Sequence, residues 1–253
     1  MRLQDKVCLI TGGGSGIGRA AAHHMAREGA RVVIADWNAA TGAAVAEEIR
    51  QAGNQALFQQ ADVSKSADCE AMVARALLEY GRLDVLFANA GVEPWQQDGF
   101  AHTVSEEVWD RIHDVNLRGL WLSCKYAAQP MLAQGHGVIL ITGSPTGITG
   151  CAADQIAYSA SKGGAMGLAR AMAVGYAPHN IRVNIIVPGS TETPLTAALF
   201  DQPGVRARAV AAIPAGRLGT AEDVSGLVVF LASDEARYCI GGYYMADGGL
   251  LAI

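Results

Sequence analysis

Long apolar runs are missing from this sequence. The N-terminal residues Met1–Lys6 are charged and lead straight into a short apolar stretch, with no apolar segment of signal-peptide length. Even the longer apolar runs, such as Gly226–Ala232, fall far short of the roughly 20 residues that a membrane span needs. We therefore expect a soluble protein of the cytoplasm, with no membrane partner.

Paired spacing is also missing among the cysteines and histidines. The chain has 5 cysteines and 6 histidines, without the spacing of a metal site or a disulfide framework. The adjacent His23 and His24 would diverge on a helix instead of converging on one ion. We expect buried thiols and no metal. The cysteines are Cys8, Cys69, Cys124, Cys151 and Cys239.

Positive charge is scarce and is not clustered. The formal net charge is -5, and the sequence contains no basic block. Nucleic acid binding would require a concentrated positive patch, so a nucleic acid partner is not expected.

Apolar residues, in contrast, are abundant. Hydrophobic residues make up 51% of the 253 residues and charged residues 17%, which is enough to bury a large core. No Pro/Gly/Ser linker, repeat or low-complexity tract divides the chain. The sequence predicts one α/β domain over residues 1–253.

Short β-branched runs alternate with longer, alanine-rich stretches of helical periodicity. This alternation predicts a doubly wound parallel sheet of about seven strands with helices on both faces. The expected strands are Val7–Thr11, Arg31–Asp36, Ala56–Ala61, Val85–Ala88, Val138–Thr142, Ile181–Val187 and Tyr243–Ala246. The clearest expected helices are Gly16–Glu28, Ala40–Ala52, Ser66–Tyr80 and Ile156–Ala177.

One segment interrupts this rhythm. Residues 190–214 contain Pro194, Pro203, Gly204 and Pro214, and lie between a strand and a helix that starts near Ala221. Long insertions of this kind in α/β enzymes are often lids over a site. We expect a substrate lid, and an ordinary surface loop is the alternative.

A glycine-rich turn follows the first strand and opens a helix. Residues 11–18 read TGGGSGIG, with the spacing Gly-x-x-x-Gly-x-Gly. Glycines allow a tight turn and a close approach to a pyrophosphate, and the helix N-terminus adds amide donors and a positive dipole end. In this position the turn predicts a Rossmann-type dinucleotide site, although a plain tight turn would have similar residues.

Asp36 ends the second strand, close to the place where a carboxylate holds the adenosine ribose hydroxyls. A 2′-phosphate would face a like charge there. The neighbours Trp37, Asn38 and Ser15 provide no cation to offset it. The sequence therefore predicts NAD in preference to NADP, unless Asp36 is only a cap at the strand end.

Tyr158 and Lys162 are four residues apart on a predicted helix, so they share one face. A tyrosine with a pKa near 10 is a poor base at neutral pH, and a nearby ammonium would lower that pKa. The pair predicts a general acid/base. A lone Tyr-x-x-x-Lys is more often an exposed pair on an amphipathic helix.

Taken together, these motifs resemble those of the short-chain dehydrogenase/reductase family over nearly the whole chain. Further motifs carry the resemblance: Asp62-Val63, Asn89-Ala90-Gly91, Asn116, Ser144, Pro188-Gly189 with Thr191 and Thr193, and Asp247-Gly248-Gly249. The resemblance implies cofactor contacts by Gly12, Ser15, Gly16, Ile17, Gly18, Asp36, Asp62, Val63, Asn89, Ala90, Gly91, Tyr158, Lys162, Pro188, Gly189, Thr191 and Thr193.

The same resemblance implies four catalytic residues. Ser144 would orient the substrate oxygen, Tyr158 would exchange the proton, Lys162 would lower the pKa of Tyr158 and bind the nicotinamide ribose, and Asn116 would hold a water of the proton relay. The chain departs from the family at Pro145, where small residues are common, and at Gly242-Tyr243 in place of the more usual Gly-Gln. The first departure would reshape the substrate wall.

The substrate is predicted from the residues expected around it. Glu93, Trp95, Ser144, Thr146 and Tyr158 are the candidate contacts, within a pocket that would also include Pro94, Pro145–Ile148, Cys151 and Ala152. Glu93 would accept hydrogen bonds from a hydroxylated substrate, as it resembles a glutamate of bacterial sugar 1-dehydrogenases in the family. We expect a sugar, sugar acid or polyol, unless Glu93 is a solvated loop residue.

Two other functions stay open. A 3-oxoacyl thioester reductase usually prefers NADPH and basic surface residues, which Asp36 and the net charge of -5 disfavour. A non-catalytic NAD-sensing protein would have no need of the reacting groups. Family members are usually dimers or tetramers, so a homo-oligomer, as a homotetramer or dimer, is expected through the helix 163–175 and the tail 250–253.

Overall fold

Seven parallel strands form the central sheet of the computed structural model, which describes residues 1–252. Ile253, the end of the tail expected at an oligomer contact, lies outside the described residues. In spatial order the strands are β3 (Ala56–Gln60), β2 (Arg31–Asp36), β1 (Val7–Thr11), β4 (Val85–Ala88), β5 (Gly137–Thr142), β6 (Ile181–Pro188) and β9 (Tyr243–Ala246). The strand order reverses between β1 and β4, where α/β folds bind ligands. The predicted doubly wound sheet is confirmed.

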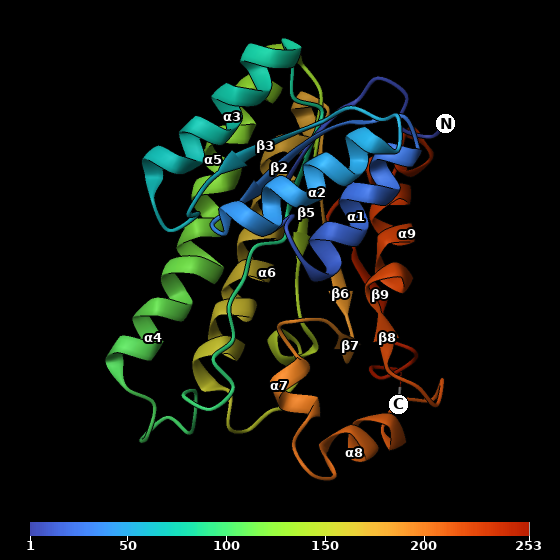
Figure 1. Ribbon diagram of the computed structural model, residues 1–253. Helices are drawn as coiled ribbons and strands as arrows, with labels where there is room; N and C mark the ends of the chain where they lie inside the picture. Colours follow the sequence, from blue (N-terminus) through green and yellow to red (C-terminus); the bar gives the residue numbers. More distant parts are fainter. Residues whose placement is uncertain (253) are drawn as a thin grey trace.

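Helices cover both faces of this sheet (Figure 1). One apolar cluster joins one face to α1 (Gly16–Arg27), α2 (Ala39–Gln51) and α9 (Ala221–Ala232). A second cluster joins the other face to α3 (Ser66–Tyr80), α5 (Leu120–Gln134) and α6 (Ile156–Tyr176). The strands between the two clusters are buried on both sides, which explains their continuous apolar runs. The predicted boundaries of strands and helices differ from these by at most one residue.

The chain between β4 and α5 has an irregular helical geometry. Helix α4 (Glu106–His113) passes into a π-helical turn, Asp114–Gly119, before α5 begins. Gly119 allows this turn to approach the end of β3, because a Cβ there would lie 2.8 Å from the Val63 side chain. The π-helical turn places Asn116 in the interior, at 2% exposure.

Residues 190–214 are largely ordered into short elements. They contain β7 (Thr191–Glu192), α7 (Ala197–Phe200) and α8 (Val205–Ala211), which lie beyond one end of the central sheet in Figure 1. Strand β7 pairs with β8 (Gly219–Thr220), and Phe200, Ile213 and Leu218 form a small core of their own. The remaining short elements are 3-10 turns at Pro145–Gly147, Ala177–His179 and Asp234–Ala236.

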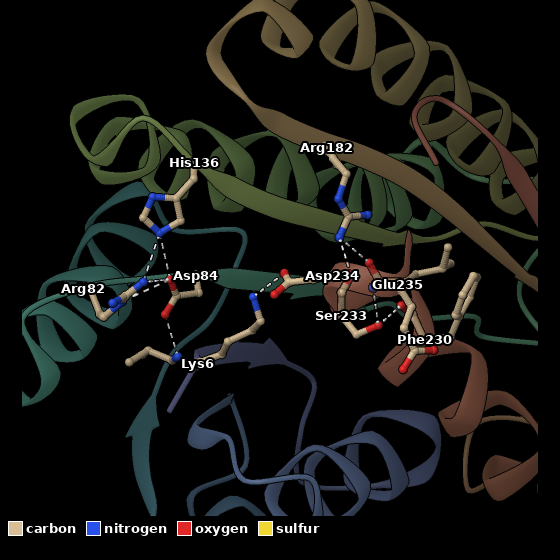
Figure 2. Close-up of polar contacts among 11 residues, drawn as sticks. Lys6, Arg82, Asp84, His136, Arg182, Phe230, Ser233, Asp234 and Glu235 are labelled. Atoms are coloured by element: carbon tan, nitrogen blue, oxygen red, sulfur yellow. Dashed lines mark hydrogen bonds and ion pairs between the residues drawn. The ribbon is translucent and has the colours of Figure 1, made fainter. Parts of the chain in front are cut away.

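A polar cluster closes the opposite edge of the sheet, at the amino ends of the strands (Figure 2). The buried Asp84 carboxylate accepts hydrogen bonds from the Val7 amide at 2.8 Å and from Arg82. His136 lies 3.0 Å from the same carboxylate. The cluster therefore joins β1, β4 and the start of β5 by charge-assisted contacts.

Among residues 1–252, none of the helices combines the length and the hydropathy required of a membrane span.

Candidate active site

A cavity of about 1480 Å³ opens at the carboxyl ends of the strands, under α7 and α8. That volume exceeds the roughly 300–1,000 Å³ of a pocket for one drug-sized ligand, and it can hold a dinucleotide beside a substrate. Its walls include these predicted residues: Gly12, Ser15, Gly16, Ile17, Asp36, Asp62, Val63, Asn89, Ala90, Gly91, Trp95, Ser144, Thr146, Tyr158, Lys162, Pro188, Gly189, Thr191 and Thr193. Gly18, Glu93 and Asn116 lie behind these walls.

Two glycines of the turn lie so close to neighbouring backbone atoms that a side chain would not fit there. Gly12 has a φ of +65°, and a Cβ there would lie 3.0 Å from the Ala90 Cα. A Cβ on Gly18 would lie only 2.1 Å from the Gly12 carbonyl oxygen. Gly18 thus permits the turn to close without touching the cavity. Ser15 at the N-cap of α1 makes no side-chain hydrogen bond to the helix, so the helix start presents its amides to the cavity.

Asp36 connects the glycine turn to the end of β2. Its Oδ2 accepts a hydrogen bond from the Gly14 amide at 2.9 Å, and its Oδ1 accepts one from the Asn38 amide at 2.9 Å. Asp36 is 7% exposed and lines the cavity. Each carboxylate oxygen retains a second acceptor position. The carboxylate is therefore both a local cap and an acceptor available to ribose hydroxyls.

These features fit an adenine dinucleotide. A substituted Gly14 would bring a Cβ to 2.9 Å from Asp36 Oδ2, so only glycine leaves this corner open. Exposed Trp37 stands at the cavity rim beside it. At the other end of the glycine turn, a Cβ on Gly16 would lie 3.3 Å from Thr193 Cβ, so the start of the 190–214 segment lies against the turn.

Tyr158 and Lys162 lie on the first turns of α6 and line the same wall of the cavity as Ser144. The Lys162 Nζ lies 5.6 Å from the Tyr158 ring centroid and donates a hydrogen bond to the Thr142 carbonyl oxygen at 2.8 Å. Ser144 caps the 3-10 turn that begins at Pro145, and its Oγ lies 3.0 Å from Thr146 Oγ1. Because Pro145 is the first residue of that turn, its missing N–H leaves no bond unmade.

The pKa of the Tyr158 phenol is shifted in the opposite direction to the one expected from the sequence. Desolvation by burial and the Glu93 charge raise the pKa of the Tyr158 phenol above its usual value, and a hydrogen bond with Ser144 only partly opposes them. Burial also lowers the pKa of Lys162 to about 8, against the opposing effect of Glu93. The protein alone therefore does not acidify the phenol, because burial and the Glu93 charge together outweigh the hydrogen bond with Ser144.

The Asn116 side chain forms hydrogen bonds with the loop that follows β4. Its Oδ1 accepts a hydrogen bond from the Val92 amide at 2.8 Å, and its Nδ2 donates one to the Val92 carbonyl oxygen at 2.9 Å. The same Nδ2 donates to Ser161 Oγ at 3.3 Å, and Ser161 Oγ donates to the Tyr158 carbonyl oxygen at 2.7 Å. Asn116 thereby links the β4 loop to the helix of Tyr158.

Glu93, expected as either a pocket contact or a solvated residue, is neither in this structure. It is 5% exposed, and both carboxylate oxygens are buried without a hydrogen-bond partner. Burial, with the charges of Asp98 and Asp154, raises the pKa of Glu93 to about 8 in spite of Lys162. Pro94, Gly147 and Ile148 also lie away from the cavity wall.

The substrate end of the cavity is mostly apolar. Trp95 lies beside the reacting groups, with its ring centroid 6.4 Å from that of Tyr158. The hydroxyls of Ser144 and Tyr158 lie there, and further polar side chains come from Thr146, Gln155, Ser190 and Thr196. The apolar side chains at this end are Trp95, Pro145, Cys151, Ala152, Pro194, Leu195, Leu199, Phe200, Val205, Ala209, Ala212 and Leu250.

Several residues that line the cavity were not predicted from the sequence. Thr142 ends β5 and Gly143 follows it directly before Ser144, and the position of that strand end could have indicated both residues. Gln155 precedes the Tyr158 helix by one residue and had no motif to mark it. Helix α4 contributes Glu107, Asp110 and Arg111 from a segment where no strand or motif pointed to the cavity.

Comparisons with known proteins agree with this architecture. A family model described as enoyl-(acyl carrier protein) reductase matches residues 12–251. The cis-4-hydroxycyclohexanecarboxylate dehydrogenase of Sinomonas cyclohexanicum is 40% identical over 250 residues, which are 98% of each chain. Levodione reductase has a similar structure, with a TM-score of 0.93 and 35% identity over 99% of each chain.

A third protein, from Beutenbergia cavernae, is provisionally named an NAD(P)-dependent gluconate 5-dehydrogenase. Its structure holds NADP at low occupancy, and it is 37% identical with a TM-score of 0.93 over 99% of this chain and 98% of its own. The matches extend over almost the whole chain and agree with the motifs and the sheet order. The chain belongs to the short-chain dehydrogenase/reductase family of oxidoreductases.

Proposed function

We propose that the protein is an NAD-dependent dehydrogenase that interconverts a secondary alcohol and a ketone, with Tyr158 as the general acid/base. One observation carries the proposal. Ser144, Tyr158 and Lys162 line one wall of a cavity whose far end is formed by the glycine turn and Asp36. A proton-transfer group and a dinucleotide cradle therefore face one cavity.

The chemistry divides between the chain and its cofactor. Ser144 Oγ orients the substrate oxygen, and the Tyr158 phenolate removes the hydroxyl proton during oxidation. Lys162 faces the Tyr158 ring at 5.6 Å, so its ammonium stabilises that phenolate. When bound, the nicotinamide supplies the hydride acceptor and a second positive charge. Asn116 holds the Val92 backbone and the Ser161 hydroxyl, which keeps α6 and the β4 loop in register.

The preference for NAD rests on charge. Asp36 Oδ1 and Oδ2 would accept hydrogen bonds from ribose hydroxyls, and a 2′-phosphate would meet the carboxylate at contact distance. Around it, Trp37, Asn38 and Thr41 line the cavity, and none of them carries a cation. The structure of the Beutenbergia cavernae relative holds NADP, so the test below includes both cofactors.

The side chains at the substrate end of the cavity favour a compact alcohol with an apolar body. The 190–214 segment contributes Leu195, Leu199 and Phe200 to the substrate end, and we propose that it is the lid over the substrate. The hydroxycyclohexane ring in the name of the Sinomonas cyclohexanicum relative has this character. A sugar, sugar acid or polyol is the second candidate, supported by the gluconate relative.

A homo-oligomer is part of the same proposal. Val174 on α6 is 78% exposed, and Met245 and Tyr238 expose apolar surface beside the edge strand β9. Light scattering coupled to gel filtration would report the mass, and a monomer at assay concentration would contradict this part.

The function is tested by a substrate panel with both cofactors. Cyclohexanol, 4-hydroxycyclohexanecarboxylate, glucose, gluconate, a polyol and a 3-oxoacyl thioester would be assayed by the absorbance of the reduced nicotinamide. We expect a higher kcat/KM with NAD than with NADP, and alicyclic alcohols ahead of sugars. Tighter binding of NADP in a fluorescence titration would refute the cofactor assignment, and the absence of turnover on all alcohols and ketones would refute the reaction.

A further inference from the structure

Helix α6, which carries Tyr158 and Lys162, has no side-chain cap from its own N-terminal segment. Gln155 is the N-cap residue, and it makes no side-chain hydrogen bond to the helix. The first amides of a helix have no intrahelical partner and must be satisfied from elsewhere. The partners of these amides therefore show what holds the first turn of α6.

Two residues of a distant loop supply those partners. The Ile156 amide donates to the Gly99 carbonyl oxygen at 3.3 Å. The Ala157 amide donates to Asp98 Oδ1 at 3.2 Å, and the Tyr158 amide donates to Asp98 Oδ2 at 3.0 Å. One carboxylate, 60 residues earlier in the chain than Tyr158, thus bonds to the backbone of that residue.

The loop that carries Asp98, residues 92–104 between β4 and α4, is held at several points. Asn116 binds both the N–H and the carbonyl oxygen of Val92. The Gly99 amide donates to Asp98 Oδ1 at 2.8 Å, which fixes the carboxylate relative to its own loop. The Asp98 carboxylate therefore reaches α6 from a restrained support, so its two bonds can transmit the position of the loop to Tyr158.

We propose that Asp98 is a positioning residue for the reaction: it caps the catalytic helix from a distance and fixes the backbone from which the Tyr158 phenol extends. An anion at a helix N-terminus is stabilised by the dipole and by the free amides. Displacement of a reacting group by about 1 Å can cost about 10²-fold in rate. This inference rests on the proposed role of Tyr158 as the general acid/base.

The experiment compares Asp98→Ala and Asp98→Asn with Ser105→Ala. Ser105 caps α4 through the Val108 amide at 3.3 Å, so its loss removes a helix cap that does not hold Tyr158. We expect Asp98→Ala to lower kcat by about 10-fold to 10²-fold, with the Kd for NADH changed less than about twofold. Asp98→Asn retains one acceptor oxygen and should fall between Asp98→Ala and the parent. Ser105→Ala should lower Tm and leave kcat within about twofold.

A double-mutant cycle separates positioning from general damage. If Asp98 acts through the phenol, Asp98→Ala should cost less than about twofold in kcat when Tyr158→Phe is already present. A larger solvent isotope effect on kcat in Asp98→Asn would support the same conclusion, because misaligned proton transfer becomes more rate-limiting. Full additivity in the cycle, or a kcat of Asp98→Asn equal to that of the parent, would overturn the inference.

Two outcomes distinguish an error in the proposed function from an error in the role of Asp98. Should Tyr158→Phe retain the parent kcat, the proposed function itself is wrong. Should Tyr158→Phe be inactive while both Asp98 variants turn over like the parent, only the role of Asp98 is wrong.

Discussion

The indole Nε1 of Trp95 donates a hydrogen bond to the Leu195 carbonyl oxygen at 2.5 Å. These residues are 100 positions apart and belong to the loop after β4 and to the 190–214 segment. The Trp95 ring also lies beside Tyr158, at 6.4 Å between centroids. One side chain therefore connects the proposed lid to the wall that carries the reacting phenol.

Trp95→Phe should weaken substrate capture while leaving the chemical step nearly intact. Phenylalanine keeps an aromatic wall and removes the donor to Leu195. Since one hydrogen bond contributes about 0.5–1.5 kcal/mol, we expect KM to rise about 2-fold to 13-fold. Steady-state kinetics with the best alcohol of the panel would measure this. Trp121→Phe, at an exposed tryptophan of α5, is the control, and an unchanged KM in Trp95→Phe would show that the bond does not hold the lid.

Tyr158→Phe should lose turnover without losing the cofactor. General acid/base assistance contributes about 10²–10⁴-fold, so kcat should fall by at least that factor. The Kd for NADH, measured by fluorescence, should change only a few-fold because the cofactor cradle is untouched. Tyr176→Phe at the end of the same helix controls for removal of a hydroxyl. Turnover within about tenfold of the parent would remove Tyr158 from its role.

Glu93→Gln should stabilise the protein more at alkaline than at acid pH. Burial raises the pKa of Glu93 to about 8, whereas an unfolded glutamate titrates near 4.3. Between these values the folded protein binds more protons than the unfolded chain, so the free energy of unfolding falls as pH rises. Glutamine does not ionise and avoids this loss. Thermal melts at about pH 5 and about pH 8 should show the larger rise in Tm at the higher pH, and equal changes would contradict the assignment.

The same substitution should move the pH profile of catalysis. Burial raises the pKa of Tyr158 and lowers that of Lys162, and the Glu93 charge shifts both pKa values upward. Removing the charge should lower both, so the alkaline limb of kcat/KM should shift toward lower pH. A shift in the opposite direction would show that Glu93 does not act on the pair through its charge.

Asp84→Asn should destabilise the protein and leave catalysis unchanged. Burial opposes ionisation of Asp84, and hydrogen bonds from Arg82, the Val7 amide and His136 outweigh it, which lowers the pKa of this carboxyl. Its contribution is therefore complete above the unfolded pKa near 3.9 and is lost as pH falls through the lower folded pKa. Urea unfolding near neutral pH should show a loss of about 1.5–3 kcal/mol that shrinks in strong acid. A fall in kcat would contradict the remoteness of this cluster.

Local sequence patterns were sufficient to predict the central sheet. The run Val138–Ile141 is apolar throughout and rich in β-branched residues, so burial on both faces and the strand itself followed from one pattern. The glycine turn was also predictable, since Gly12 and Gly18 are required by backbone approaches that no side chain tolerates. Because the carboxyl ends of parallel strands meet at one edge, Asp36 and Ser144 could be assigned to the same cavity.

The remaining features depend on contacts between distant segments. The bond from Asp98 to Tyr158 joins residues 60 apart, and nothing near Asp98 in the sequence marks it as a helix cap. Lys162 was expected to govern the Tyr158 phenol because it lies one helical turn away. Burial and Glu93 dominate instead, and neither is visible in the spacing of two residues on a helix. The burial of Glu93 is likewise a tertiary feature that its neighbours in the sequence do not mark.

The bond between Gly14 and Asp36 limits how cofactor choice could be re-engineered. Replacing Asp36 to admit a phosphorylated ribose would also remove the acceptor of the Gly14 amide and loosen the glycine turn. A single exchange at this position should therefore weaken both dinucleotides, and a productive switch requires a compensating acceptor for that amide.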